Sequence, residues 1–225
     1  MSGRVVTAVN EDRLVEVGRA RVVAEIAALS ALESQIDKRL AAAARILLQA
    51  TGKVIPVGVG TSGVTARRLA HLLSVTGTPA IFLHPADGLH GSLGAIEPGD
   101  VVIAISKGGQ SAELNEFTRR AKTRGAKVIV LTSLDGSELA ALGDLTVALP
   151  TPDGADPGGV IAMGSTLIAS AWGDALAAAL MDARGYQWAE VLFTHPGGAV
   201  GRLAASDILV DQRPAVASSV AREDD

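Results

Sequence analysis

The sequence predicts an α/β protein: a three-layer αβα sandwich with a five-stranded, mainly parallel sheet, preceded by N-terminal helices. Short apolar runs alternate with longer amphipathic stretches, an order typical of parallel strands joined by crossover helices. The run Val101–Ile105 is apolar throughout, as expected for a strand covered on both faces. Two such runs end in turns rich in glycine and hydroxyl residues. With 225 residues, the chain is long enough for one domain with a sizeable core.

The first 50 residues are predicted to be helical. From Glu11 to Ala50 the sequence is rich in Ala, Leu, Arg and Glu at helical spacing, with a break near Ser30 to Ser34. This pattern predicts a helical hairpin or one long bent helix that packs on the following domain. That domain is predicted to span 51–210, and the polar segment 211–225, which lacks periodicity, is expected to be a flexible tail.

Strands and helices alternate through the predicted domain. The expected strands are Val54–Val59, Ala80–Leu83, Val101–Ile105, Val128–Leu131 and Leu145–Leu149. The expected helices are Ser62–Thr76, Ala112–Arg124, Ser137–Leu142 and Ala162–Ala183. The span 150–159 is dense in Pro, Gly and Asp, so it is predicted to be a loop that borders the pocket.

Composition excludes several classes of function. The formal net charge is −4, with no long basic run and a single Tyr, which argues against nucleic-acid binding. The longest apolar stretches are too short or interrupted for a membrane span of about 20 residues. The chain has no cysteine and its N-terminus has no secretory pattern, so a cytoplasmic location is expected. No cluster has metal-ligand spacing, and we expect neither a metal nor a cofactor.

The two glycine-rich turns are typical of phosphate sites. Each follows a predicted strand and begins a helix, whose free N–H groups and positive dipole end favour an anion. Glycine lets the backbone approach a ligand, and the hydroxyl groups bind it. The candidate phosphate-binding residues are Gly60, Thr61, Ser62, Ser106, Lys107, Gly108, Gly109, Gln110 and Ser111.

Other interpretations of these turns remain open. The pattern Gly58-x-Gly60-x-x-Gly63 also satisfies the dinucleotide fingerprint, but the second predicted strand ends at His84 rather than at an acidic residue that would hold a ribose. The glycines could serve only a tight turn, the serines could be helix N-caps, and Lys107 could be a solvated surface residue.

An ordered set of segments resembles the sugar isomerase (SIS) domain family, and within it the arabinose 5-phosphate isomerase branch. The segments are Gly58–Gly63, Thr76–Ala80, His84–Pro85, His90–Gly94, Asp100–Ser106, Ser111–Glu113, Gly173–Leu176 and His195–Gly201. The resemblance implies the SIS fold and a sugar phosphate at the two turns. Longer members carry CBS domains beyond this point, so we expect no such regulation in this chain.

The resemblance also implies catalytic roles for Glu113, His195 and His90. Glu113 matches a carboxylate thought to be catalytic, although a helix dipole favours an acid there without any catalytic duty. Histidine has a suitable pKa for moving protons near neutrality, and the alternative role of His195 is a hydrogen-bonded turn. His84 and His71 are interpreted as structural.

Two positions depart from the resembled branch. Thr61 stands where that branch usually has Lys, and Gly154 stands where it has a second acidic residue. Asp153 and Asp156 flank the second position, and either is a candidate substitute.

The sequence therefore predicts an aldose-ketose isomerase of a phosphorylated sugar, acting through an enediol. Two alternatives remain: an isomerase of a sugar phosphate other than arabinose 5-phosphate, and a non-catalytic phosphosugar sensor. Such sensors usually carry a DNA-binding domain, which does not fit in the N-terminal helices here. The resemblance also implies a homo-dimer or homo-tetramer in which the C-terminal histidine completes a neighbour's site.

Overall fold

The computed structural model describes residues 10–203, which fall into two compact units divided between Gly185 and Tyr186. The first unit contains α1 (Glu11–Glu33), α2 (Lys38–Leu48), β1 (Val54–Val57), α3 (Gly60–Val75), α4 (Pro85–Leu89), η1 (Ser92–Ala95), β2 (Val101–Ile105), α5 (Ala112–Thr123), β3 (Lys127–Thr132), α6 (Glu138–Leu142), β4 (Leu145–Ala148), η2 (Pro157–Gly159) and α7 (Gly164–Arg184). The second unit contains α8 (Trp188–Thr194) and η3 (Val200–Arg202). The predicted tail, 211–225, lies outside the described residues.

The sheet has four parallel strands in the order β1-β2-β3-β4, so the prediction of five was wrong. The segment predicted as the fifth strand forms one bridge, between Val54 and Ala80. There the Val54 N–H donates to the Pro79 carbonyl (2.9 Å) and the Ile81 N–H donates to the Val54 carbonyl (3.0 Å). The next amide facing this edge belongs to residue 56, which is Pro56 and has no N–H. Pairing along that edge therefore ends after one residue.

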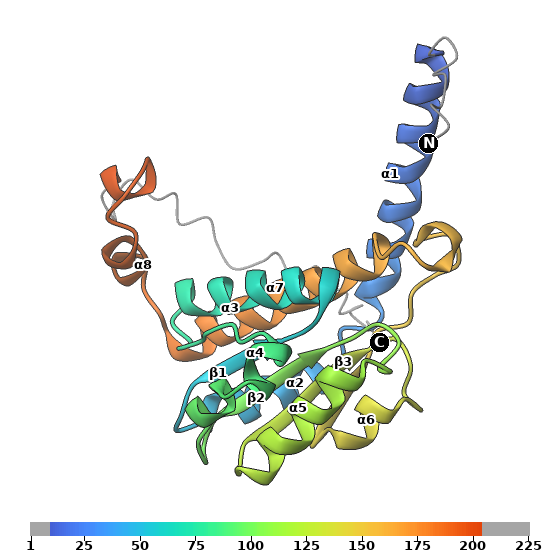
Figure 1. The fold of residues 1–225 in the computed structure, drawn as a ribbon. Coiled ribbons are helices and arrows are strands. Elements are labelled where there is room, and N and C mark those ends of the chain that lie inside the picture. Colours follow the sequence, from blue (N-terminus) through green and yellow to red (C-terminus); the bar gives the residue numbers. More distant parts are fainter. Residues whose placement is uncertain (1–9, 204–225) are drawn as a thin grey trace, which may run out of the picture. The chain divides into compact units, whose positions relative to one another are not determined.

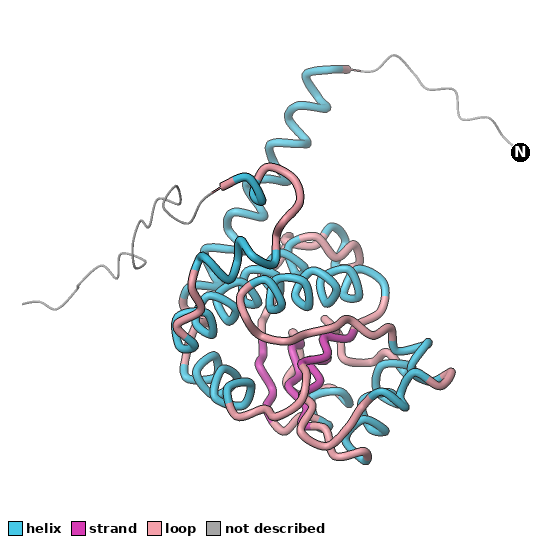
Figure 2. The backbone as a smooth tube through the Cα atoms, turned by 90° about the vertical axis from the view of Figure 1, so that its left-hand side faces the viewer, coloured by secondary structure: helices cyan, strands magenta, loops and turns pink. Residues whose placement is uncertain are grey.

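Helices cover both faces of the sheet, as predicted (Figures 1 and 2). Helices α2, α3 and α7 pack on one face, and α5 and α6 on the other. Strand β2 alternates between the two cores: Val101, Ile103 and Ile105 face the α3–α7 layer, and Val102 and Ala104 face α5. The strand is apolar at every position because neither face meets water.

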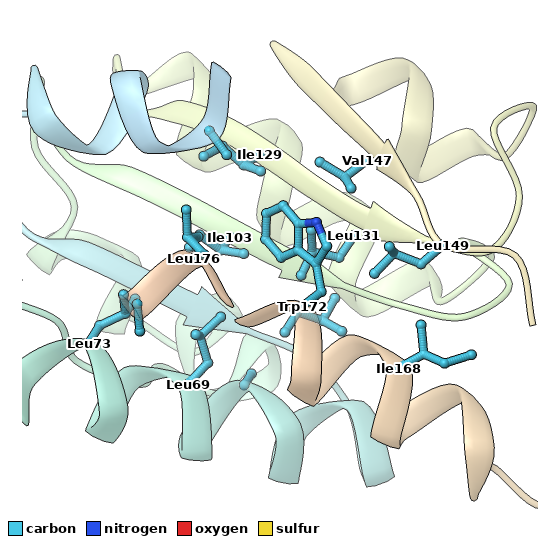
Figure 3. Packing of buried hydrophobic residues seen from close by; sticks show 14 of the residues in the cluster. Leu69, Leu73, Ile103, Ile129, Leu131, Val147, Leu149, Ile168, Trp172 and Leu176 are labelled. Carbon is cyan, nitrogen blue, oxygen red and sulfur yellow. The ribbon is translucent and has the colours of Figure 1, made fainter. Parts of the chain in front are cut away.

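The larger core surrounds Trp172 of α7, whose side chain is fully buried. In Figure 3 its indole lies between the strands and α3, close to Ile103 and Leu131. Ile168 and Leu176 flank it on α7. Residues one helical turn apart thus share one buried face, which fixes the start of α7 beside the ends of the strands.

The N-terminal segment forms two helices separated by Ser34 to Asp37, rather than one long bent helix. The Asp37 carboxylate caps α2 by accepting from the Arg39 N–H at 2.8 Å. Helix α1 contacts α7 through its C-terminal half, where Ala28 and Leu32 are buried. Among the residues described, no helix is both long enough and apolar enough to cross a membrane.

Candidate functional site

A pocket lies at the carboxyl ends of the strands, between α3 and α7. This is the edge of a parallel sheet where open α/β proteins bind their ligands. The pocket is lined by Ser62, Thr65, Ile105, Lys107, Leu131, Thr132, Ser133, Leu149, Ala162, Ser165, Thr166 and Ala169. Hydroxyl groups dominate its polar lining, and Lys107 is the charged residue among those twelve.

The first glycine-rich turn is a tight connection between β1 and α3. A Cβ added at Gly58 would lie 2.7 Å from the Ser62 backbone, and one added at Gly63 would lie 2.8 Å from the Gly58 carbonyl oxygen. The turn therefore needs glycine at both positions, which confirms a structural role for them. No side chain caps α3, and Ser62 at its start lines the pocket, so the turn also leaves an open helix N-terminus there.

The second turn, between β2 and α5, is held by its own polar groups. The Gly109 N–H donates to the Ser106 hydroxyl at 3.1 Å, and the buried Asn115 amide donates to the Gly109 carbonyl at 3.3 Å. Gly109 has φ +62°, and a Cβ there would collide with Ser137, so the turn requires glycine. Of this loop, Lys107 lines the pocket; Ser106, Gly108, Gln110 and Ser111 are not among its lining residues.

Helix α5 begins with an uncommitted hydroxyl group. Ser111 is its N-cap residue by position, yet its side chain makes no capping hydrogen bond. Two residues later Glu113 is exposed in the first turn, and no hydrogen bond or ion pair joins it to another described residue. Both side chains are thus free of structural duties within the part of the chain that the structure describes.

Lys107 and Asp156 form an ion pair at the pocket. The distance from Lys107 Nζ to Asp156 Oδ2 is 2.7 Å, and Lys107 Nζ also donates to the Gly159 carbonyl at 2.9 Å. The other carboxylate oxygen of Asp156 accepts from the N–H groups of Met163 (2.8 Å) and Ser165 (3.0 Å), so it caps α7 from outside the helix. Burial opposes ionisation of Asp156, but these bonds outweigh it and hold the pKa of this carboxyl well below its usual range.

The two positions that depart from the arabinose 5-phosphate isomerase branch lie near this pocket. Thr61 is exposed in a neighbouring groove that shares Thr65 and Thr166 with the pocket. Gly154 has φ +75°, a conformation that an acidic residue would adopt only under strain, and its carbonyl accepts from Arg21 of α1 at 3.1 Å. Of the two candidate substitutes, Asp153 is exposed, whereas Asp156 is buried beside the pocket.

The structure does not bring the two predicted catalytic histidines into this pocket. His90 is exposed at the end of α4 and lines a separate hollow with Arg67, Phe82, Leu83, His84, Asp87 and Ser92. His195 belongs to the second unit, where it ends α8 and its Nδ1 lies 2.7 Å from the Val191 carbonyl oxygen. His84 caps α4 by accepting from the Ala86 N–H, so the structural interpretation of this histidine is confirmed.

Sequence reasoning missed several residues of the pocket. Ser165 and Thr166 lie in the first turn of α7, and Thr132 and Ser133 end β3. The Ser165 hydroxyl is buried and has no hydrogen-bond partner among the described residues. One signal was present in the sequence: the Gly164-Ser165-Thr166 triplet begins a long apolar helix just after the loop predicted to border the pocket.

Residues 46–179 match the model of the SIS domain family, and the chain belongs to that family. Two curated relatives are named arabinose 5-phosphate isomerase KdsD. The Salmonella typhi protein is 36% identical over 197 residues, which cover 86% of this chain and 60% of the relative. The Pseudomonas aeruginosa protein is 37% identical over 175 residues, or 78% of this chain and 54% of the relative. The chain thus spans about three fifths or less of these relatives' length.

Solved structures agree with this assignment. An Escherichia coli protein in complex with arabinose 5-phosphate matches with a TM-score of 0.80 and 32% identity, over 84% of this chain and 100% of that one. A putative sugar-phosphate isomerase from Listeria monocytogenes matches with a TM-score of 0.81 and 30% identity over the same shares. The Vibrio vulnificus NanR protein complexed with ManNAc-6P matches at 0.69 and 25%, over 79% of this chain and 67% of that one.

Proposed function

We propose that this chain is a sugar-phosphate isomerase that interconverts an aldose and a ketose through an enediol. The observation that carries the proposal is the hydroxyl-lined pocket at the carboxyl ends of the strands, with Ser62 at an open helix N-terminus and one lysine in its wall. The identity to arabinose 5-phosphate isomerases over most of the chain supports the same reaction class.

In this proposal the phosphate is held by hydroxyl groups and helix N-termini. Ser62 and the first amides of α3 bind it from one side, and Ser106 and Ser111 bind it from the second turn. Backbone N–H groups at a helix N-terminus favour a dianion, and each hydroxyl adds a charge-assisted hydrogen bond. The hydroxyl of Ser111 is suited to this because it does not cap α5.

Isomerisation transfers one proton between neighbouring carbons and another between their oxygens. Glu113 is proposed to take the proton from the carbon that bears the hydroxyl group, giving an enediol, and to return it to the adjacent carbon. His90 or His195 is proposed to assist ring opening or proton transfer at oxygen. Electrons are only redistributed within the sugar, so the reaction needs no external oxidant or reductant.

The test is a panel of aldose and ketose phosphates, including arabinose 5-phosphate, assayed for interconversion. We expect wild type to turn over at least one member, and Glu113→Gln to lose about 10²–10⁴ in turnover while still binding the sugar, as for loss of a general base. Glu138→Gln is the matched control, because Glu138 is also an exposed acid in the first turn of a helix, α6.

A second candidate function is favoured by the missing charges at Thr61 and Gly154 and by the absence of Glu113 from the pocket lining. This candidate is a phosphosugar-binding or sensing protein without turnover. Thermal shift with the same panel separates the two: ligands that stabilise the wild type without being converted would establish the sensor and reject the isomerase.

We also propose that the chain forms a homo-dimer or homo-tetramer. The supporting observation is an exposed apolar stripe on α1, formed by Val15, Val22, Val23 and Ile26, each more than half exposed. Apolar side chains repeated along one helix favour burial against a partner.

A further inference from the structure

Two buried lysine–aspartate pairs of nearly the same geometry lie in this chain. In one, Lys53 Nζ is 2.7 Å from Asp100 Oδ2, and the side chains are 29% and 2% exposed. In the other, Lys107 Nζ is 2.7 Å from Asp156 Oδ2, and the side chains are 33% and 2% exposed. In both pairs the carboxylate also accepts two backbone N–H groups.

The two pairs differ in their place in the fold. Lys53 and Asp100 immediately precede β1 and β2, at the amino ends of the strands, and neither residue lines a described pocket. Lys107 follows β2 at the carboxyl end and lines the pocket with Ser62 and Ser165. The first pair therefore has a structural role only, and it serves as an internal reference for the second.

The Lys107 ammonium keeps bonding capacity for a ligand. An ammonium group has three N–H donors, and two are used, by Asp156 and by the Gly159 carbonyl. These contacts hold a flexible side chain in one position, so little side-chain entropy remains to be lost when an anion binds.

A second observation points to a ligand at the same place. Ser165 is 8% exposed, lines the pocket, and its hydroxyl has no hydrogen-bond partner among the described residues. A buried hydroxyl without a partner is costly, and a bound polar group would remove that cost. Ser165 lies next to the helix end that Asp156 caps, so one carboxylate organises both the lysine and the hydroxyl.

We propose that Asp156 is a positioning residue that holds Lys107 as the cationic ligand of the substrate phosphate, with Ser165 completing the site. This inference rests on the proposed function only for the identity of the sugar, because phosphate binding is measured without turnover. It places in Lys107 the positive charge that is absent at Thr61. The ligand class is a phosphate monoester.

The experiment measures the dissociation constants of inorganic phosphate and of arabinose 5-phosphate by calorimetry. Lys107→Met is expected to weaken both by about tenfold or more, the effect of removing a charged hydrogen bond. Asp156→Asn keeps an acceptor for the α7 amides and is expected to weaken binding several-fold. Added to Lys107→Met it should have little further effect, whereas a merely structural residue would act additively.

The matched control is Lys53→Met, which removes the equivalent lysine from the other pair. It is expected to lower the stability about as much as Lys107→Met and to leave both dissociation constants unchanged. The double variant Lys107→Met/Asp156→Asn removes both charges together and gives a folded protein if the single variant unfolds, because no lone buried charge remains.

Unchanged affinity in Lys107→Met, an equal loss in Lys53→Met, or no phosphate binding by wild type at millimolar concentration would overturn the inference. A wild type that binds phosphate through Lys107 but converts no sugar would support the inference and reject the isomerase. Where turnover is measurable, Asp156→Asn should raise KM and leave kcat nearly unchanged, since the residue acts on phosphate binding.

Discussion

At the residue scale, the structure separates two serines that look alike in the sequence. Ser111 and Ser137 each precede a helix, and each fits the pattern of an N-cap. The Ser137 hydroxyl accepts from the Ala140 N–H at 3.2 Å, so it caps α6. Ser111 makes no such bond, although the same residue type holds the same position. Its hydroxyl is therefore available to a ligand.

This difference gives a prediction for two alanine variants. Ser111→Ala is expected to weaken binding of the phosphorylated sugar by about ten- to a hundredfold and to leave stability nearly unchanged. Ser137→Ala is expected to cost about 1 kcal/mol of stability, the usual effect of losing a cap, and to leave affinity unchanged. Calorimetry and urea denaturation measure the two effects. The opposite assignment, with Ser111→Ala destabilising the fold and binding normally, would remove Ser111 from the site.

At the scale of elements, two carboxylates anchor the ends of strands and helices. Asp100 joins the segments before β1 and β2, because it accepts from the N–H groups of Lys53 and Glu97 and pairs with the Lys53 ammonium. Burial opposes ionisation of Asp100, but these bonds outweigh it and lower its pKa below the ordinary value of 3.8. Asp156 caps α7 in the same manner.

The direction of the Asp100 shift predicts how stability depends on pH. Because the pKa is lower in the folded state, the unfolded chain binds more protons as pH falls below about 4, so the stabilisation present above that pH is lost. Asp100→Asn should be less stable than wild type at pH 7 and should lose less stability between pH 5 and about 3. Urea denaturation across this range tests the prediction, with the exposed Asp153→Asn as control. Parallel losses in wild type and Asp100→Asn would contradict it.

At the scale of the whole molecule, the proposed catalytic groups come from distant parts of the chain. Glu113 begins α5 in the first unit, and His195 ends α8 in the second. Helix α1 presents an apolar stripe that suits a second copy of the chain. These features support the proposal of a homo-oligomer with shared sites.

Complementation between two inactive variants tests the shared site. If His195 acts in a neighbour's pocket, mixing Glu113→Gln with His195→Ala chains should assemble some pockets with both wild-type groups. A mixed dimer would then regain part of the wild-type activity, whereas each variant alone stays inactive. Mixing Glu113→Gln with an untagged copy of itself is the control. A monomer in light scattering at micromolar concentration, or verified mixed oligomers with no recovery, would refute the proposal.

Much of the architecture could be predicted from local patterns. The strand Val101–Ile105 has the predicted bounds, and the layers follow from apolar runs that alternate with amphipathic stretches. The fifth strand could not be judged from its own residues, because what ends it is the missing N–H of Pro56 on the neighbouring strand. Pairing is a property of two segments, and propensity describes only one.

The sequence by itself determined the fold class, the SIS family and the two turns at helix N-termini, because each depends on residues close together in the chain. Only the tertiary structure decided how Lys107 is used. Its partner, Asp156, is 49 residues away (156 − 107) and had been considered only as a substitute acid. The pocket forms where β2, β3, α3 and α7 meet. Its electrostatics depend on side chains brought together by packing, and no local pattern records that distance.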